Sequence, residues 1–268
     1  MTYHSTEFGL PGSLSAELRG ETAVLRLSRA KKRNAIDRAM AEGIDRFFTD
    51  LPQDIRAVVI HGEGDHFSAG VDLSAIVEID APTALFGSRS IHRVLEKVEQ
   101  CTVPVIAVLH GAVIGLGLEL AAAAHIRVAQ RDAFYGLPEG IRGIFVGGGA
   151  AVRVPRLIGV PRMMDMMLTG RTYGAEEGMA LGLSQYLVER GEGLAKGVEL
   201  AARISTNAPL SNYAILQALP RIARADPDAG FLLESLMSAV VVADDEAELR
   251  LRAFLEKRAP KVSHETKS

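Results

Sequence analysis

The order of apolar and polar positions predicts a hairpin followed by a helix near the start of the chain. Residues 13–18 alternate polar with apolar and residues 22–28 contain a compact apolar patch, so the two segments are expected to pair around Gly20. Asp37 is a candidate helix cap, and the helix is expected to end at about Leu51. Its apolar side chains recur at helical spacing, at Met40, Ile44, Phe47 and Phe48.

Strands and helices are then predicted to alternate. Short apolar runs at residues 57–60 and 105–109 indicate buried strands, and a loop is expected over residues 62–72. Helices are expected around residues 88–99 and from about Gly115 onward. This alternation of strand, turn and helix is typical of the α/β fold class, which is the class predicted here.

A change in composition divides the chain into two predicted regions. Glycine is dense from residue 136 to residue 149 and less frequent afterwards. The C-terminal part is expected to be helical, with caps or breakers at Asn207, Pro209, Pro220 and Pro227. We therefore predict a core that carries the functional site over residues 1–198 and a helical region over residues 199–268.

Composition limits the classes of partner. The 268 residues are 48% hydrophobic, which is enough for a large core, and the net charge of -3 gives no general attraction to nucleic acid or to an anionic membrane. Cys101 is the single cysteine, so no intrachain disulfide is possible, and the histidine spacing indicates no metal site. The N-terminus lacks a signal-peptide pattern and no apolar run reaches membrane-spanning length. A small-molecule partner and a cytoplasmic location are therefore expected.

Two glycine-containing turns each follow a predicted strand, DHFSAGVDL at residues 65–73 and HGAVIGLGLEL at residues 110–120. Glycine lets backbone N–H groups point into a cleft, and a helix that starts just after the turn adds its positive end. Two such turns could hold one anionic oxygen, as an oxyanion hole does for a thioester that becomes an enolate. The alternative interpretation is that both are tight turns between strand and helix.

Two glutamates are candidate acids or bases. Glu119 interrupts the apolar run of residues 116–124, where burial of an unpaired carboxylate would raise its pKa, as proton transfer requires. The alternative for Glu119 is a first-turn residue stabilised by the helix dipole. Glu139 stands between Pro138 and Gly140 and, taken alone, is expected to be a solvated loop acid. Together the two side chains could hold one water, with one as base and the other as proton donor.

Two further clusters have two interpretations each. The basic turn at residues 29–33, with Arg29, Lys31, Lys32 and Arg33, would suit the phosphates of a nucleotide-like carrier, although surface charge near a turn is the commoner explanation. Methionines at positions 163, 164, 166 and 167 could line a flexible apolar pocket, but such a helix face is more often core or subunit interface.

Four separated motifs, RAKKRNAI, FSAGVDL, GLGLEL and YGLPEGIRGIFVGGGAAVRVPRLIG, resemble those of the crotonase (enoyl-CoA hydratase/isomerase) superfamily in order and spacing. The resemblance covers about residues 14–258. It implies a spiral of repeated ββα units, followed by a C-terminal helical region used to form trimers that often pair into hexamers.

The resemblance also implies roles for four residues. The N–H groups of Val71 and Leu116 would form the oxyanion hole, although the family usually has glycine at the position of Leu116. Hydratases carry glutamates at the positions of Glu119 and Glu139, whereas isomerases commonly keep only the second. Retention of both favours an enoyl-CoA hydratase. The alternatives are an enoyl-CoA isomerase, another crotonase-type lyase, or a non-catalytic acyl-CoA binder.

Further residues are expected by resemblance to contact coenzyme A, which is part of the substrate rather than a separate cofactor. Contacts to the substrate are expected at Lys31, Arg33, Ala35, Ala69, Asp72, Leu73, Gly115 and Pro138. Phe254 and Lys257 resemble residues that reach the coenzyme A of a neighbouring subunit. The expected partners are therefore an acyl-CoA thioester and further copies of this chain, in a homotrimer or homohexamer.

Overall fold

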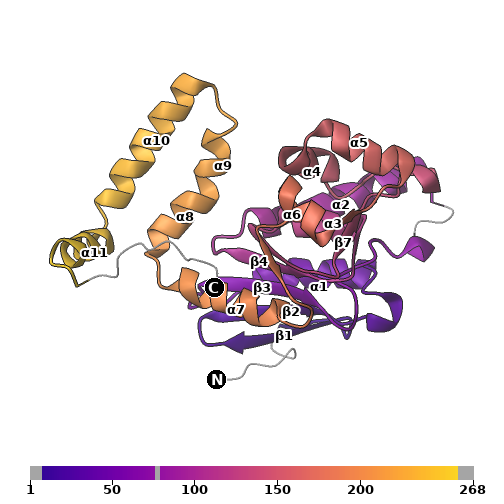
Figure 1. The fold of residues 1–268 in the computed structure, drawn as a ribbon, viewed down its shortest axis with the longest axis horizontal. Coiled ribbons are helices and arrows are strands. Elements are labelled where there is room, and N and C mark those ends of the chain that lie inside the picture. The colour runs from indigo at the N-terminus through magenta and orange to yellow at the C-terminus, as the bar shows by residue number, and fades with distance from the viewer. Residues whose placement is uncertain (1–7, 76–78, 259–268) are drawn as a thin grey trace. The chain divides into compact units, whose positions relative to one another are not determined.

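The computed structural model describes residues 8–75 and 79–258, and the chain divides into two compact units, residues 1–205 and 206–268 (Figure 1). The predicted boundary at residue 198 falls inside helix α7 (Gly193–Ser205). Leu200 and Ala201 of this helix are buried against the main sheet of the first unit. The boundary between the units therefore lies after the end of α7, at residue 205, and not at residue 198.

The main sheet has six strands in the order β1-β2-β3-β4-β6-β9. Its first two strands are the predicted hairpin, in which Leu14 lies opposite Leu27 and Arg19 opposite Thr22, and every later pairing is parallel. Both expected strands, at 57–60 and 105–109, are confirmed. The bounds are β1 (Leu14–Arg19), β2 (Thr22–Leu27), β3 (Ala57–Gly62), β4 (Val105–Leu109), β6 (Ile126–Gln130) and β9 (Tyr186–Val188).

In the described part of the first unit, a smaller sheet and six more helices accompany the main sheet and α7. The smaller sheet has the order β5 (Ala112–Ile114), β7 (Phe134–Gly136) and β8 (Tyr173–Gly174). The helices are α1 (Arg38–Thr49), α2 (Ala81–Glu99), α3 (Leu116–Ala123), α4 (Ala150–Ile158), α5 (Val160–Thr169) and α6 (Ala175–Leu181). Short 3₁₀ turns cover Ala30–Lys32, Leu73–Ala75 and Gly140–Arg142.

The main sheet is buried on both faces, as parallel sheets in α/β proteins are. Leu25, Val58 and Ile60 belong to a large core cluster that includes residues of α1 and α2. Val59 and Val108 belong to a second cluster, on the face that α7 covers. The central strands are therefore continuous apolar runs, and the α/β class is confirmed.

The predicted cap of α1 is confirmed, whereas α2 begins earlier than expected. Asp37 accepts a hydrogen bond from the Met40 N–H at 2.8 Å, and the helix ends near the expected position. The predicted helix at 88–99 begins at Ala81, because Asp80 caps it by accepting from the Thr83 N–H at 2.9 Å. Its exposed first turns carry no amphipathic pattern that marks their start.

The second unit is helical, as predicted. It contains α8 (Pro209–Gln217), α9 (Leu219–Ile222), α10 (Pro227–Val242) and α11 (Asp245–Leu255). Asp226 and Asp244 cap α10 and α11 through backbone N–H groups of the following residues. Gly230 is the one buried residue of α10, although the helix is rich in leucine and valine. Within the described parts of both units, no helix combines the length and apolar character that crossing a membrane requires.

Candidate active site

The two glycine turns of the sequence lie side by side. The Ser68 N–H donates to Ala112 O at 2.9 Å and the Ile114 N–H donates to Ser68 O at 3.0 Å, so the turns are joined as neighbouring strands would be. Gly70 has a φ of 99°, and a Cβ there would lie 2.8 Å from Ile114 O. Glycine is required at this position both by backbone conformation and by the close approach.

Val71 and Leu116 each follow a glycine of these turns. Within the described residues, neither backbone N–H donates to a protein acceptor. Leu116 is the first residue of α3, where N–H groups have no intrahelical partner. A Cβ on Gly70 would lie 3.4 Å from Leu116 N, which places that N–H beside the first turn. Both N–H groups are thus unused at the point where the turns meet.

Glu119 lies in the first turn of α3 and is 2% exposed. Its Oε2 accepts hydrogen bonds from the Gly148 N–H at 2.7 Å and the Ala150 N–H at 2.8 Å. Burial raises the pKa of Glu119, and these N–H donors and the nearby Arg153 oppose that rise. The carboxylate is therefore buried yet held by donors that favour its charged form.

Glu139 is 6% exposed, so its interpretation as a solvated loop acid was wrong. Within the described residues its Oε2 has no hydrogen-bond partner, and its Oε1 would be 2.9 Å from a Cβ on Gly115. Burial, with a smaller contribution from the charge of Glu119, raises the pKa of Glu139 to about 7. A carboxyl group with a pKa near neutrality and a free oxygen is suited to proton transfer.

Comparison with known proteins identifies the family to which this arrangement belongs. The family model described as enoyl-CoA hydratase/isomerase matches residues 17–265. The chain belongs to this family. The enoyl-CoA hydratase EchA19 of Mycobacterium tuberculosis is 35% identical over 252 residues, which cover 91% of this chain and 94% of that protein.

Solved structures agree with the family and with its fold. A candidate enoyl-CoA hydratase from Rhodopseudomonas palustris is 56% identical, with a TM-score of 0.90 and coverage of 92% of this chain and 95% of that one. An enoyl-CoA hydratase from Bacillus anthracis is 29% identical, with a TM-score of 0.87 and coverage of 93% and 98%. This enoyl-CoA hydratase/isomerase family member therefore has the crotonase fold that its motifs predict.

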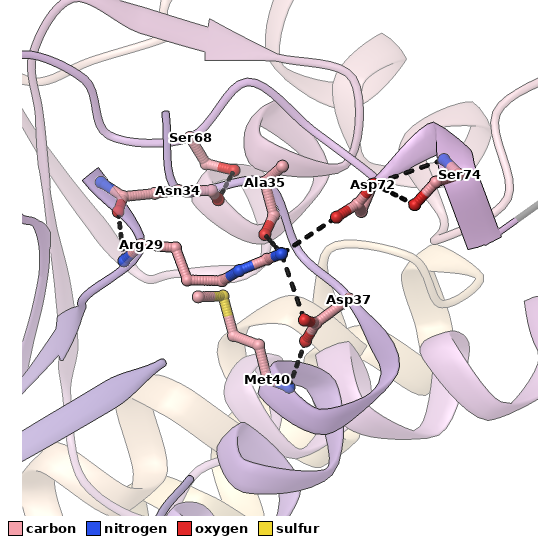
Figure 2. Close-up of polar contacts among 8 residues, drawn as sticks. All are labelled: Arg29, Asn34, Ala35, Asp37, Met40, Ser68, Asp72 and Ser74. Carbon is pink, nitrogen blue, oxygen red and sulfur yellow. Dashed lines mark hydrogen bonds and ion pairs between the residues drawn. The ribbon is translucent and has the colours of Figure 1, made fainter. Parts of the chain in front are cut away.

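Arg29 in this family member makes contacts within the protein. Figure 2 shows its guanidinium between three acceptors: Ala35 O at 2.6 Å, Asp72 Oδ2 at 3.0 Å and Asp37 Oδ2 at 3.2 Å. The hydrogen bonds from Ser74 and Arg29 lower the pKa of Asp72. Arg29 is thus a structural part of the basic turn, and the side chain of Asp72 is engaged by Arg29 and Ser74.

The other members of the basic turn remain on the surface beside the first glycine turn. Lys31, Lys32 and Arg33 are exposed. The Ala69 N–H donates to Arg33 O at 2.9 Å and so links the two turns. Leu73 is also exposed, one residue beyond Asp72. The structure thus brings Lys31, Arg33, Ala35, Ala69, Asp72 and Leu73 into one region.

Asn34 is a residue that the motif analysis missed. Its side chain donates to Glu63 O at 2.9 Å and His66 O at 2.7 Å, and accepts from the Arg29 N–H at 2.9 Å. Asn34 is fully buried and has a φ of 53°, a left-handed conformation that asparagine tolerates better than most residues. The signal in the sequence was an asparagine directly after a basic turn.

The remaining predicted residues fall in two groups. Gly115 and Pro138 adjoin the glycine turns and Glu139, whereas Phe254 and Lys257 lie in the second unit. A cavity of about 300 Å³ near the ends of β3, β4 and β6 is lined by other residues, including His61, His110 and Arg190. Within residues 8–75 and 79–258, no three histidine, cysteine, aspartate or glutamate side chains are grouped as metal ligands.

Proposed function

We propose that the protein is an enoyl-CoA hydratase, which adds water reversibly across the 2,3-double bond of a trans-2-enoyl-CoA. The observation that carries this proposal is the burial of two carboxyl groups, Glu119 and Glu139, beside the same pair of glycine turns. Isomerisation needs one group to move one proton, whereas hydration needs a base for the water and an acid for the carbon.

The thioester carbonyl oxygen would accept hydrogen bonds from the Val71 and Leu116 N–H groups. Charge that develops on this oxygen as water attacks C3 is then stabilised by preorganised donors, each of which typically contributes about 100- to 1000-fold in rate. The free N–H groups at the meeting point of the turns support this assignment.

The two glutamates would divide the proton transfers. Glu119, held by the Gly148 and Ala150 N–H groups, accepts a proton from the attacking water. Glu139, whose pKa of about 7 keeps a large protonated fraction at neutral pH, donates a proton to C2. The oxygen–C3 and hydrogen–C2 bonds form as the double bond is lost, and solvent exchange returns both carboxyl groups to their starting states.

Coenzyme A and further copies of the chain are the expected partners. Lys31 and Arg33, exposed next to the first glycine turn, would bind phosphate groups of coenzyme A. Gly115 and Pro138 would border the acyl group. We propose that no cofactor besides the substrate takes part, and that the enzyme acts as a homotrimer or homohexamer in the cytoplasm.

The test is the loss of conjugated enoyl absorbance with crotonyl-CoA and a panel of longer and aromatic enoyl-CoAs. Glu119→Gln and Glu139→Gln should each lower kcat by at least about 100-fold, because each removes one proton-transfer group. Glu42→Gln, an exposed residue of α1, is the matched control and should keep wild-type rates.

Product mass separates the alternatives. A product heavier by one water supports hydration, and an unchanged mass with a shifted double bond identifies an isomerase, for which Glu119→Gln would retain activity. Binding of enoyl-CoA without any turnover would overturn the proposal in favour of an acyl-CoA binder.

A further inference from the structure

Arg153 lies in the first turns of α4 and its side chain is only 10% exposed. Its Nε donates to Glu99 Oε2 at 2.8 Å, and its Nη2 is 2.7 Å from the same oxygen. Its Nη1 donates to Gly148 O at 3.0 Å. One guanidinium therefore joins the end of α2 to the glycine turn that precedes α4.

The same turn supplies the two donors that hold Glu119. The Gly148 N–H and the Ala150 N–H both point at Glu119 Oε2, and the peptide between residues 148 and 149 lies between them. Arg153 binds the carbonyl oxygen of that peptide. The Gly148 N–H belongs to the peptide before this one and the Ala150 N–H to the peptide after it, so a contact that anchors the carbonyl limits movement of the segment that carries both donors.

The turn has the shape that this contact requires. Gly149 has a φ of 107°, which other residues rarely adopt, and a Cβ there would lie 2.3 Å from Arg153 Nη1. A Cβ on Gly148 would lie 2.9 Å from Glu119 Oε2. Glycine at both positions lets the guanidinium approach one side of the turn while the carboxylate approaches the other.

We propose that Arg153 is a positioning residue, which holds the turn of residues 148–150 so that two backbone N–H groups donate hydrogen bonds to the Glu119 carboxylate. The proposal rests on the proposed function for its catalytic consequence. Glu99 completes the arrangement by engaging the Nε and Nη2 groups, which leaves Nη1 for the Gly148 carbonyl. The planar fork of arginine makes both contacts at once, which a lysine cannot do.

The charged groups around Glu119 decide the expected change in titration. The positive charge of Arg153 favours the ionised form of Glu119. Glu139 disfavours that form, because the two carboxylates repel each other, and the charge of Glu119 correspondingly raises the pKa of Glu139. Without Arg153, the Glu119 carboxylate would lose a neighbouring positive charge and its two N–H donors would be held less firmly, while the side chain would remain buried. Its pKa would therefore rise, and a smaller fraction would be ionised at neutral pH.

The experiment compares Arg153→Met, Arg153→Lys and Arg156→Met. Arg156 is exposed on the same helix and serves as the control for loss of an arginine from α4. Arg153→Met should lower kcat by about 10- to 100-fold with little change in KM, since the coenzyme A contacts are elsewhere. The acidic limb of its pH profile should move up by about 1 unit. Arg153→Lys keeps the positive charge, so its pH profile should move by less than that of Arg153→Met. Arg156→Met should match wild type in both kcat and pH profile.

A second readout does not depend on turnover. Proteins labelled with ¹³C at the glutamate side-chain carboxyl report each titration by NMR without substrate, with Glu119→Gln used to assign the signal. A higher titration midpoint for Glu119 in Arg153→Met supports the positioning role even if the substrate is not an enoyl-CoA. A folded Arg153→Met variant whose Glu119 titrates as in wild type, or whose loss lies only in KM, would overturn it.

Discussion

The carboxyl group of Glu139 has a cost to stability that depends on pH. Burial raises its pKa from the ordinary 4.5 to about 7, so the folded protein holds this proton more tightly than the unfolded chain does. The stabilisation by this proton is fully present below about pH 4.5 and is lost as pH rises through about 7. At alkaline pH the ionised, buried carboxylate destabilises the fold.

Glu139→Gln removes this titration while it keeps the shape of the side chain. Relative to the variant, wild type should lose on the order of 2 to 3 kcal/mol of unfolding free energy between pH 4.5 and 8. Urea unfolding at a series of pH values and one protein concentration measures the difference. A difference that stays constant with pH would show that Glu139 titrates normally.

Leu116 shows how a departure from the family pattern is accommodated. The side chain that replaces the usual glycine is 7% exposed and belongs to the main core cluster. Its Cδ1 would lie 2.7 Å from a Cβ on Gly148, so it packs against the turn that holds Glu119. Within the described part of the chain the N–H of Leu116 has no protein acceptor, while its side chain packs against the turn whose N–H groups hold Glu119.

At the scale of elements, the sequence pattern predicted the features that depend on interactions between residues close together in the chain. The hairpin at Gly20 and the cap at Asp37 depend on residues a few positions apart, and both are present. The start of α2 at Ala81 was missed because its first turns are exposed and have no apolar period.

Contacts between distant segments could not be read from the chain. The burial of Glu139 depends on Gly115, and the donors to Glu119 come from residues about 30 positions further along. Arg29 looked like one more cation of a basic turn, but its acceptors include Asp72 on another loop. The candidate residues were thus predicted by type and motif, whereas their partners follow from the packing of the sheet and its helices.

The basic turn provides a prediction that separates its two kinds of cation. Arg29→Met should lower unfolding free energy clearly more than a substitution of an exposed cation does, because it leaves Asp72 and Asp37 without their shared partner. Lys31→Met should change the unfolding free energy by no more than about 0.5 kcal/mol, because Lys31 is exposed. It should raise KM for an enoyl-CoA, because Lys31 is proposed to bind a phosphate of coenzyme A. Thermal unfolding and initial rates on both variants measure this. Equal effects of the two substitutions on stability would contradict the assignment.

At the scale of the whole molecule, the second unit exposes many large apolar side chains. Phe231, Leu236 and Val240 of α10 are all more than half exposed, and α11 exposes Leu249, Phe254 and Leu255. A helix that is apolar around most of its circumference is normally covered. The trimer implied by the motifs would supply that cover from further copies of the chain.

Leu236→Glu tests this expectation together with the role of the C-terminal residues. A carboxylate placed in an apolar subunit contact costs several kcal/mol. If the proposed assembly forms through this helix, wild type should have three or six times the mass of a single chain by light scattering, and the variant should have the mass of one chain. Glu234→Gln on the same exposed helix should leave the assembly intact. If Phe254 and Lys257 reach the coenzyme A of a neighbouring subunit, dissociation should also raise KM while the Glu119 and Glu139 chemistry stays in place. A wild-type protein with the mass of one chain would exclude both the assembly and the shared site.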